Sequence, residues 1–156
     1  MPAFVFSSSK NLLCLQMNSK GSTAFCITPL CFDQQLQCAS FDVRLKGTTP
    51  KTTHGLDVQK LFDVYPDLRK HRCDSGRHRS FFDEARQTET VHLLEHLAVE
   101  LLVLSGVPRS EARGQTGIPQ GENQDFYRLR LYGAGSLGQA NELLTDASLA
   151  IEKLLL

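Results

Sequence analysis

The sequence of 156 residues contains no tryptophan, and aromatic residues make up only 8% of it. No apolar run approaches the ~20 residues that a membrane-spanning helix needs. The apolar start, Met1–Phe6, has no basic region before it, which argues against a secretory signal. Seventeen basic side chains balance seventeen acidic ones, so no net charge would attract nucleic acid or an anionic membrane. We therefore expect a cytoplasmic protein with neither nucleic-acid nor membrane partners.

Two common binding motifs are also missing. The five cysteines are odd in number and irregularly spaced, and Cys26 and Cys31 lack the two-residue gap of a zinc knuckle. This pattern favours buried free thiols over a disulfide framework. The short segment 133–135, Gly-Ala-Gly, lacks the strand–loop–helix context of a phosphate-binding loop. No nucleotide is expected.

The chain divides near residue 40. Residues 1–39 hold four of the five cysteines and almost no charge, and we expect either a poorly ordered leader or divergent strands there. Three short apolar segments could be strands: 3–6, 12–15 and 24–27. Residues 40–156 are expected to form the domain, because hydrophobic periodicity begins there.

Strand and helix patterns are mixed within this second region. Alternation predicts strands at 41–45 and 126–132. Helical spacing and capping signals predict helices at 56–65, 80–86, 90–105 and 137–155, with a further turn at 67–71 and a capping box formed by Ser136 and Gln139. The Gly- and Gln-rich stretch 109–124 is expected to be a loop. Together these elements predict one small α+β domain, with a short mixed or antiparallel sheet packed by three to four helices.

The third predicted helix carries His92-Leu93-Leu94-Glu95-His96, the inverted form of the zinc-hydrolase motif. Residues four apart lie on the same face of a helix, so His92 and His96 can bind one zinc ion. Glu95 lies beside them and can accept a proton from a water bound to that ion. The motif therefore predicts zinc ligands at His92 and His96 and a general base at Glu95.

The same pattern also fits an ordinary solvated helix face, because polar residues gather on one side and leucines cover the other. Val99 and Val103 fall within the polar side at about 100° per residue. A solvated face would not need them, so we expect this side to be partly covered, as the floor of a cleft.

A third metal ligand is not evident from the motif. Glu100, one turn beyond His96, is one candidate, although it could instead be a partner of a histidine outside the metal shell. The downstream carboxylates remain open alternatives: Glu111, Glu122, Asp125 and Glu142.

Several segments in the same order resemble the N-terminal domain of cyanophycin synthetase. The most specific is Thr88–Leu102, which resembles the Thr-x-x-Gly-His-x-x-Glu-His-x-Ala-Leu-Glu-Leu-Gln signature of that domain. The other matching segments are Tyr65–Leu68, His71–Cys73, Phe81–Phe82, Ser105–Val107, Arg113–Gly117, Phe126–Leu129 and the last predicted helix. The resemblance covers about two thirds of the chain and leaves residues 1–39 unmatched.

In that family the domain precedes an ATP-grasp ligase and a Mur-ligase-like domain, and it engages an Asp–Arg polymer. Some members use it as a metal-dependent hydrolase of the polymer. The resemblance implies the same roles for His92, His96 and Glu95. Neither ligase domain is present in this sequence, so we expect a stand-alone domain that works alone or beside separate ligase subunits.

Two hypotheses follow. The first is a zinc-dependent hydrolase of amide bonds in a polar peptide or a cyanophycin-like polymer, with Arg113, Arg128 and Arg130 as candidates for binding substrate carboxylates. The second is a non-catalytic module that binds a polymer or a protein. The family's strand has a Glu, a plausible third ligand, near the position of Tyr132, and this difference favours the second hypothesis.

Overall fold

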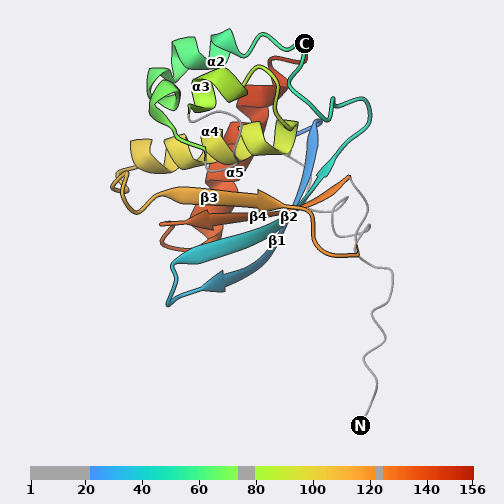
Figure 1. The fold of residues 1–156 in the computed structure, drawn as a ribbon. Coiled ribbons are helices and arrows are strands. Elements are labelled where there is room, and N and C mark those ends of the chain that lie inside the picture. Colours follow the sequence, from blue (N-terminus) through green and yellow to red (C-terminus); the bar gives the residue numbers. More distant parts are fainter. Residues whose placement is uncertain (1–21, 74–79, 122–124) are drawn as a thin grey trace.

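Four strands form an antiparallel sheet in the order β1-β2-β4-β3 (Figure 1). In this computed structural model the described residues are 22–73, 80–121 and 125–156. The strands are β1 (Phe25–Asp33), β2 (Cys38–Leu45), β3 (Arg113–Gly117) and β4 (Phe126–Tyr132). Among the described strands, the two edges of the sheet are therefore β1 and β3, and β3 pairs only with β4.

The alternation predicted for β4 is present in its burial: Leu129 and Leu131 are fully buried, whereas Arg130 between them is exposed. In β2, Phe41 and Val43 are fully buried, and Asp42 between them is also buried, where it pairs with Arg128. Successive side chains of a strand point to opposite faces, so one face of the sheet is apolar and needs a cover.

Helices α4 and α5 supply that cover, and the shorter helices lie beyond α4 (Figure 1). The helices are α2 (Gln59–Val64), the 3₁₀ helix η1 (Pro66–Lys70), α3 (Phe81–Glu84), α4 (Thr90–Leu104) and α5 (Leu137–Glu152). The predicted α+β class, with its small antiparallel sheet and three to four helices, is confirmed. In the described residues no helix has both the length and the apolar character to cross a bilayer.

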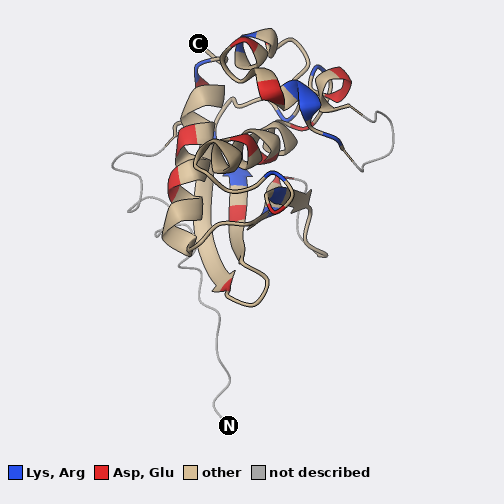
Figure 2. Cartoon of the chain, turned by 90° about the vertical axis from the view of Figure 1, so that its left-hand side faces the viewer, with Lys and Arg blue, Asp and Glu red and all other residues tan. Residues whose placement is uncertain are grey.

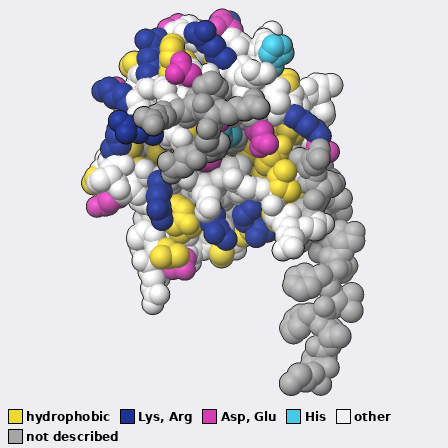
Figure 3. All heavy atoms as spheres, viewed as in Figure 1, with side chains coloured by type: hydrophobic (Ala, Val, Ile, Leu, Met, Phe, Trp, Pro, Cys, Tyr) yellow, Lys and Arg dark blue, Asp and Glu magenta, His cyan; other side chains and the backbone are white. Residues whose placement is uncertain are grey.

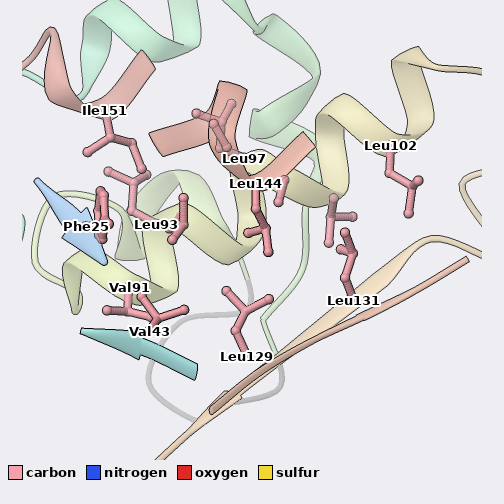
Figure 4. Packing of buried hydrophobic residues seen from close by; sticks show 14 of the residues in the cluster. Phe25, Val43, Val91, Leu93, Leu97, Leu102, Leu129, Leu131, Leu144 and Ile151 are labelled. Carbon is pink, nitrogen blue, oxygen red and sulfur yellow. The ribbon is translucent and has the colours of Figure 1, made fainter. Parts of the chain in front are cut away.

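The core lies between the sheet and these two long helices (Figure 4). Leu93 and Leu97 of α4 meet Leu144 of α5 and the apolar face of the sheet, and all three leucines are at most 1% exposed. Complete burial of a leucine contributes roughly 1.5–3 kcal/mol. This packing fixes the rotation of α4 about its axis, and so fixes where its polar side points.

The starts of the two long helices are anchored. The cap predicted for α5 is present: Ser136 Oγ accepts from the Gln139 backbone N–H at 3.1 Å, and the Gln139 side chain accepts from the N–H of Gly135, one residue before the cap. Acidic residues follow α5 along its length (Figure 2). The start of α4 is tied to the chain after β2, because Thr90 N–H donates to the Lys51 carbonyl at 2.8 Å.

The sequence pattern missed one strand of the sheet. Residues 109–124 were expected to be a loop, but Arg113–Gly117 forms β3. The division expected near residue 40 falls inside β2, and β1 of the preceding region is a member of the sheet with Phe25 in the core. The apolar segment 24–27 overlaps β1, as predicted. The segments 3–6 and 12–15 lie outside the described residues.

The cysteines differ from the expectation of buried free thiols. Cys31, Cys38 and Cys73 are not in disulfide bonds, and of these three only Cys38 is buried. Cys26 is disulfide-bonded. The expectation is therefore wrong for Cys26 and for the exposed Cys31.

Candidate metal centre

The two histidines of the α4 motif converge. His92 Nε2 and His96 Nε2 are 3.0 Å apart. Two nitrogens at ~2.1 Å from one tetrahedral zinc ion would be roughly 3.4 Å apart, so the observed separation is close to what a shared ion requires. Glu95 and His96 are each only 7% exposed. The polar side of α4 is therefore covered, and the interpretation as a solvated face is excluded.

Cys73 adds a third donor from a different part of the chain. Its Sγ lies 3.2 Å from His92 Nε2, and donor atoms of Cys73, His92 and His96 all lie within 4.8 Å of one another. Three nitrogen and sulfur ligands with an open fourth position are typical of catalytic zinc sites. The motif on α4 gave no indication that Cys73 is a candidate ligand. The one indication in the sequence was that Cys73 lies in the His71–Cys73 segment, which is part of the family resemblance.

The outer nitrogens of both histidines also have partners. His92 Nδ1 lies 2.8 Å from Thr88 Oγ1, and His96 Nδ1 lies 3.1 Å from His71 Nδ1. On its other side, His71 Nε2 lies 2.7 Å from Glu100 Oε2. A buried imidazole held at its outer nitrogen keeps a fixed ring orientation, as the ligands of metal sites generally do.

These contacts determine which nitrogens carry protons. An ionised Glu100 can only accept, so the proton of neutral His71 lies on Nε2, and its Nδ1 accepts. His96 must then donate from Nδ1, which leaves a lone pair on the Nε2 that faces His92. The Thr88 hydroxyl can accept from His92 Nδ1–H in the same way. The pattern is thus compatible with two lone pairs directed at one point.

Burial favours the neutral form of His71 and of His96. It is the main cause that lowers the pKa of His96 to about 2, with the nearby His92 and His71 adding to the effect. The pKa of His71 is also lowered by burial, although its contact with Glu100 opposes the shift. The ring of Phe81 stacks on His96 with centroids 3.8 Å apart and covers one side of it. Neutral imidazole is the form that binds a metal ion.

Glu95 lies between α4 and β3. Its Oε2 accepts a hydrogen bond from the Thr116 hydroxyl, and Gly114 packs directly against its side chain. Burial raises the pKa of Glu95, and this effect exceeds the opposing effects of the Thr116 hydrogen bond and of His92. A carboxylate with a raised pKa is a stronger base, which suits proton transfer.

Glu100, the candidate third ligand, points elsewhere. Its carboxylate accepts from His71 and, at 3.2 Å, from Arg109. It is 1% exposed and is not among the described side chains whose donor atoms gather at the histidines. The alternatives Glu111, Asp125 and Glu142 are not in that group either, and Glu122 lies outside the described residues. Glu100 therefore lies behind His71 as a partner of a histidine, which is the alternative that the sequence left open for it.

A cavity of about 920 Å³ opens in front of these residues. His92, Glu95 and His96 line it, and so does Val99, which confirms that this part of α4 forms a cleft floor. On this face of the molecule, a His and acidic side chains are visible at the middle, with Lys and Arg side chains around them (Figure 3).

The three candidate arginines are not brought together at this cavity. Arg113 lines it, with its guanidinium 4.3 Å from the centre of the Tyr132 ring. Arg128 instead pairs with Asp42 at 2.9 Å on the other face of the sheet, and Arg130 is exposed there. Neither of them lines the cavity.

Comparison with known proteins identifies the family of this chain. Residues 40–131 match the cyanophycin synthase-like N-terminal domain, and curated proteins give no match. The matched region is more than half of the 156 residues and contains all of α4 and β3. The chain therefore belongs to the cyanophycin synthase-like N-terminal domain family.

Proposed function

We propose that the chain is a zinc-dependent hydrolase of amide bonds in a polar peptide or an Asp–Arg polymer. The observation that carries the proposal is the convergence of Cys73, His92 and His96 beside the buried carboxylate of Glu95. The donor set itself supports zinc, because imidazole nitrogen and thiolate sulfur are the ligands that zinc prefers, whereas magnesium and calcium take oxygen. The hydrogen bonds at the outer nitrogens support it further, because they leave both inner nitrogens able to bind a cation.

When bound, zinc would polarise the substrate carbonyl and lower the pKa of a water molecule. Cys73, His92 and His96 would hold the ion, and Glu95 would serve as general base. The carboxylate takes a proton from the water that attacks the carbonyl carbon, and then gives that proton to the leaving nitrogen as the C–N bond breaks. The Thr116 hydroxyl holds Oε2 of Glu95 in place during this transfer.

A second candidate function is a non-catalytic binding module for a polymer or a protein. One observation favours it: the donor atoms of Cys73, His92 and His96 lie at hydrogen-bonding distances, so a His92 that carries its proton on Nε2 would donate to His96 rather than bind an ion. In that case the cavity would bind a peptide or polymer without cleaving it.

Metal analysis separates the two candidates. We expect purified protein to bind one equivalent of zinc, and we expect His92→Ala and Cys73→Ser to lose it. The matched control is Cys31→Ser, because Cys31 is a free, exposed cysteine on β1 that should not affect the metal. Protein that binds no zinc after reconstitution under reducing conditions would leave only the binding module.

Hydrolysis is then measured on polar peptides and on the Asp–Arg polymer. Glu95→Gln should keep its zinc and lose at least about 10²-fold in rate, the contribution typical of a general base. If the zinc-loaded wild type cleaves none of these amides, the proposed hydrolysis is contradicted, although zinc binding is supported.

A further inference from the structure

The cavity follows the edge of a strand rather than its face. Four consecutive residues of β3, Arg113 to Thr116, line it. Successive side chains of a strand point to opposite faces, so a cavity lined by four residues in a row must run along the edge that the main chain presents. That edge is the outer one, because the other side of β3 is paired with β4.

The outer edge of β3 carries backbone N–H and C=O groups that could pair with another strand. Within the described ranges, no backbone hydrogen bond joins 113–117 to any segment other than β4. A strand edge of this kind presents alternate N–H and C=O groups to whatever lies beside it. The sequence of β3, Arg-Gly-Gln-Thr-Gly, places no bulky apolar side chain along it.

The candidate metal centre lies directly beside this edge. Glu95 contacts Gly114 and bonds Thr116, the two β3 residues that face α4. Residues 70–73 line the same cavity and include the candidate ligand Cys73. Among the described residues, the space is therefore bounded by β3, by the floor of α4 and by the 70–73 segment.

We propose that this cavity binds an extended polypeptide as an additional strand paired to β3. The proposal rests on the proposed function and specifies how its substrate is held. An added strand would lie about 4.8 Å from β3, and pairing with its five residues would engage roughly 16 Å of main chain. Such pairing supplies affinity through main-chain hydrogen bonds and leaves side-chain preference to the surroundings.

The geometry determines which atoms meet. In an added strand, side chains level with Gly114 and Thr116 point toward Glu95 and the floor of α4, and the peptide groups between them pass beside that carboxylate. Side chains of the opposite parity point toward the other face of the sheet, where Arg113 lies. The cavity lining carries both signs of charge: Lys70, Arg72 and Arg113 favour carboxylates of a bound peptide, whereas Glu84, Glu89 and Glu95 favour its basic side chains.

Backbone NMR with hydrogen exchange tests the pairing directly. The zinc-loaded Glu95→Gln chain is saturated with a short unstructured peptide of Asp, Arg and Ser, so that binding is observed without cleavage. Alternate N–H groups of β3, those directed away from β4, should exchange at least about tenfold more slowly. Strand β1, the other sheet edge, is the internal control and should not change.

The matched ligand is a peptide with the same side chains and N-methylated central amides. It should bind at least about tenfold more weakly, because it has lost the donors on which pairing depends. Binding of both peptides with equal affinity, or binding without protection of β3, would overturn the inference, and so would failure of the unmodified peptide to bind. Protection of β3 in the peptide-free chain that grows with protein concentration would identify a second copy as the occupant instead.

Failure of the proposed function gives a different result. If wild type cleaves peptides but β3 gains no protection, the hydrolase stands and the added strand is refuted. If β3 gains protection and wild type cleaves nothing, the added strand stands and the chain is a binding module.

Discussion

The contact between Gly114 and Glu95 gives the sharpest test of the site. A Cβ atom placed on Gly114 would lie 2.4 Å from Cγ, 2.9 Å from Oε1 and 3.0 Å from Cδ of Glu95. A Cβ on Gly117, in the same strand, would have nothing within 4 Å. Neither glycine has a positive φ, so alanine is allowed by the backbone at both positions. The two Gly→Ala variants therefore differ only in what the new methyl group meets.

The magnitude follows from where the clash falls. Cγ is in the middle of the Glu95 side chain, so the carboxylate must swing away from β3 and lose its hydrogen bond from Thr116. Overpacking of this kind costs about 1–3 kcal/mol. Replacing glycine by alanine stabilises by about 0.4–1 kcal/mol through the unfolded chain, and this gain applies to both variants. We expect Gly114→Ala to lose about 1–2 kcal/mol and Gly117→Ala to lose nothing or to gain slightly.

Denaturant unfolding measures the difference in stability between the two variants, and this test does not require the chain to be an enzyme. Metal analysis and hydrolysis rates measure the effect on the site. Gly114→Ala should keep its zinc, because all three clashing atoms belong to Glu95. Its hydrolysis rate should fall toward that of Glu95→Gln. Gly117→Ala should match wild type in all three measurements. Equal stability and equal rates for the two alanine variants would refute the placement of Glu95 against β3.

Three further outcomes follow from the buried groups and from the cavity wall. Glu100→Gln removes the charge behind His71 and should cost about 1–3 kcal/mol in denaturant unfolding and weaken zinc binding by about 10–100-fold in competition with a chelator; unchanged zinc affinity would contradict the assigned role. The folded-state pKa of His96 is lowered to about 2 from an ordinary value near 6.5. As the pH falls below 6.5, His96 therefore gains a proton only in the unfolded state. The metal-free chain should therefore lose about 2 kcal/mol between pH 6.5 and pH 5, as measured by unfolding in buffers across this range, and His96→Gln should flatten the slope. Arg113→Ala should raise KM for a carboxylate-bearing peptide, whereas Arg130→Ala, away from the cavity, should not; equal effects on KM would exclude Arg113 as a specific contact.

Local periodicity predicted the elements that carry their own signal. Helix α4 and strand β4 were predicted almost to the residue, because an amphipathic helix of 15 residues and a strand with strict alternation are both evident in a single segment. Strand β3 was missed because Arg-Gly-Gln-Thr-Gly has neither apolar alternation nor β-branched residues beyond Thr116. Its extended form comes from pairing with β4, which no local pattern contains.

The same distinction applies to the site. The relation of His92, Glu95 and His96 is set within one helix, so spacing alone was enough to predict it. Cys73 is 19 residues from His92 in the sequence, and its approach depends on the packing of the 70–73 segment against α4. Sequence spacing placed Glu100 near the histidines but could not decide its partner, because His71 comes from that same separate segment.

The segment that carries Cys73 is held beside α4 by contacts that do not involve a metal ion. The His71 carbonyl accepts from Phe81 N–H at 3.0 Å, the Phe81 ring stacks on His96, and the His71 imidazole joins His96 to Glu100. Small zinc domains that unfold without metal lack such a core and obtain folding free energy from the ion. Here the leucines between the sheet and α4 already form a hydrophobic core, so the folding free energy does not have to come from an ion. The candidate ligands are therefore preorganised, and an ion bound there would add chemistry to a domain whose core is already packed.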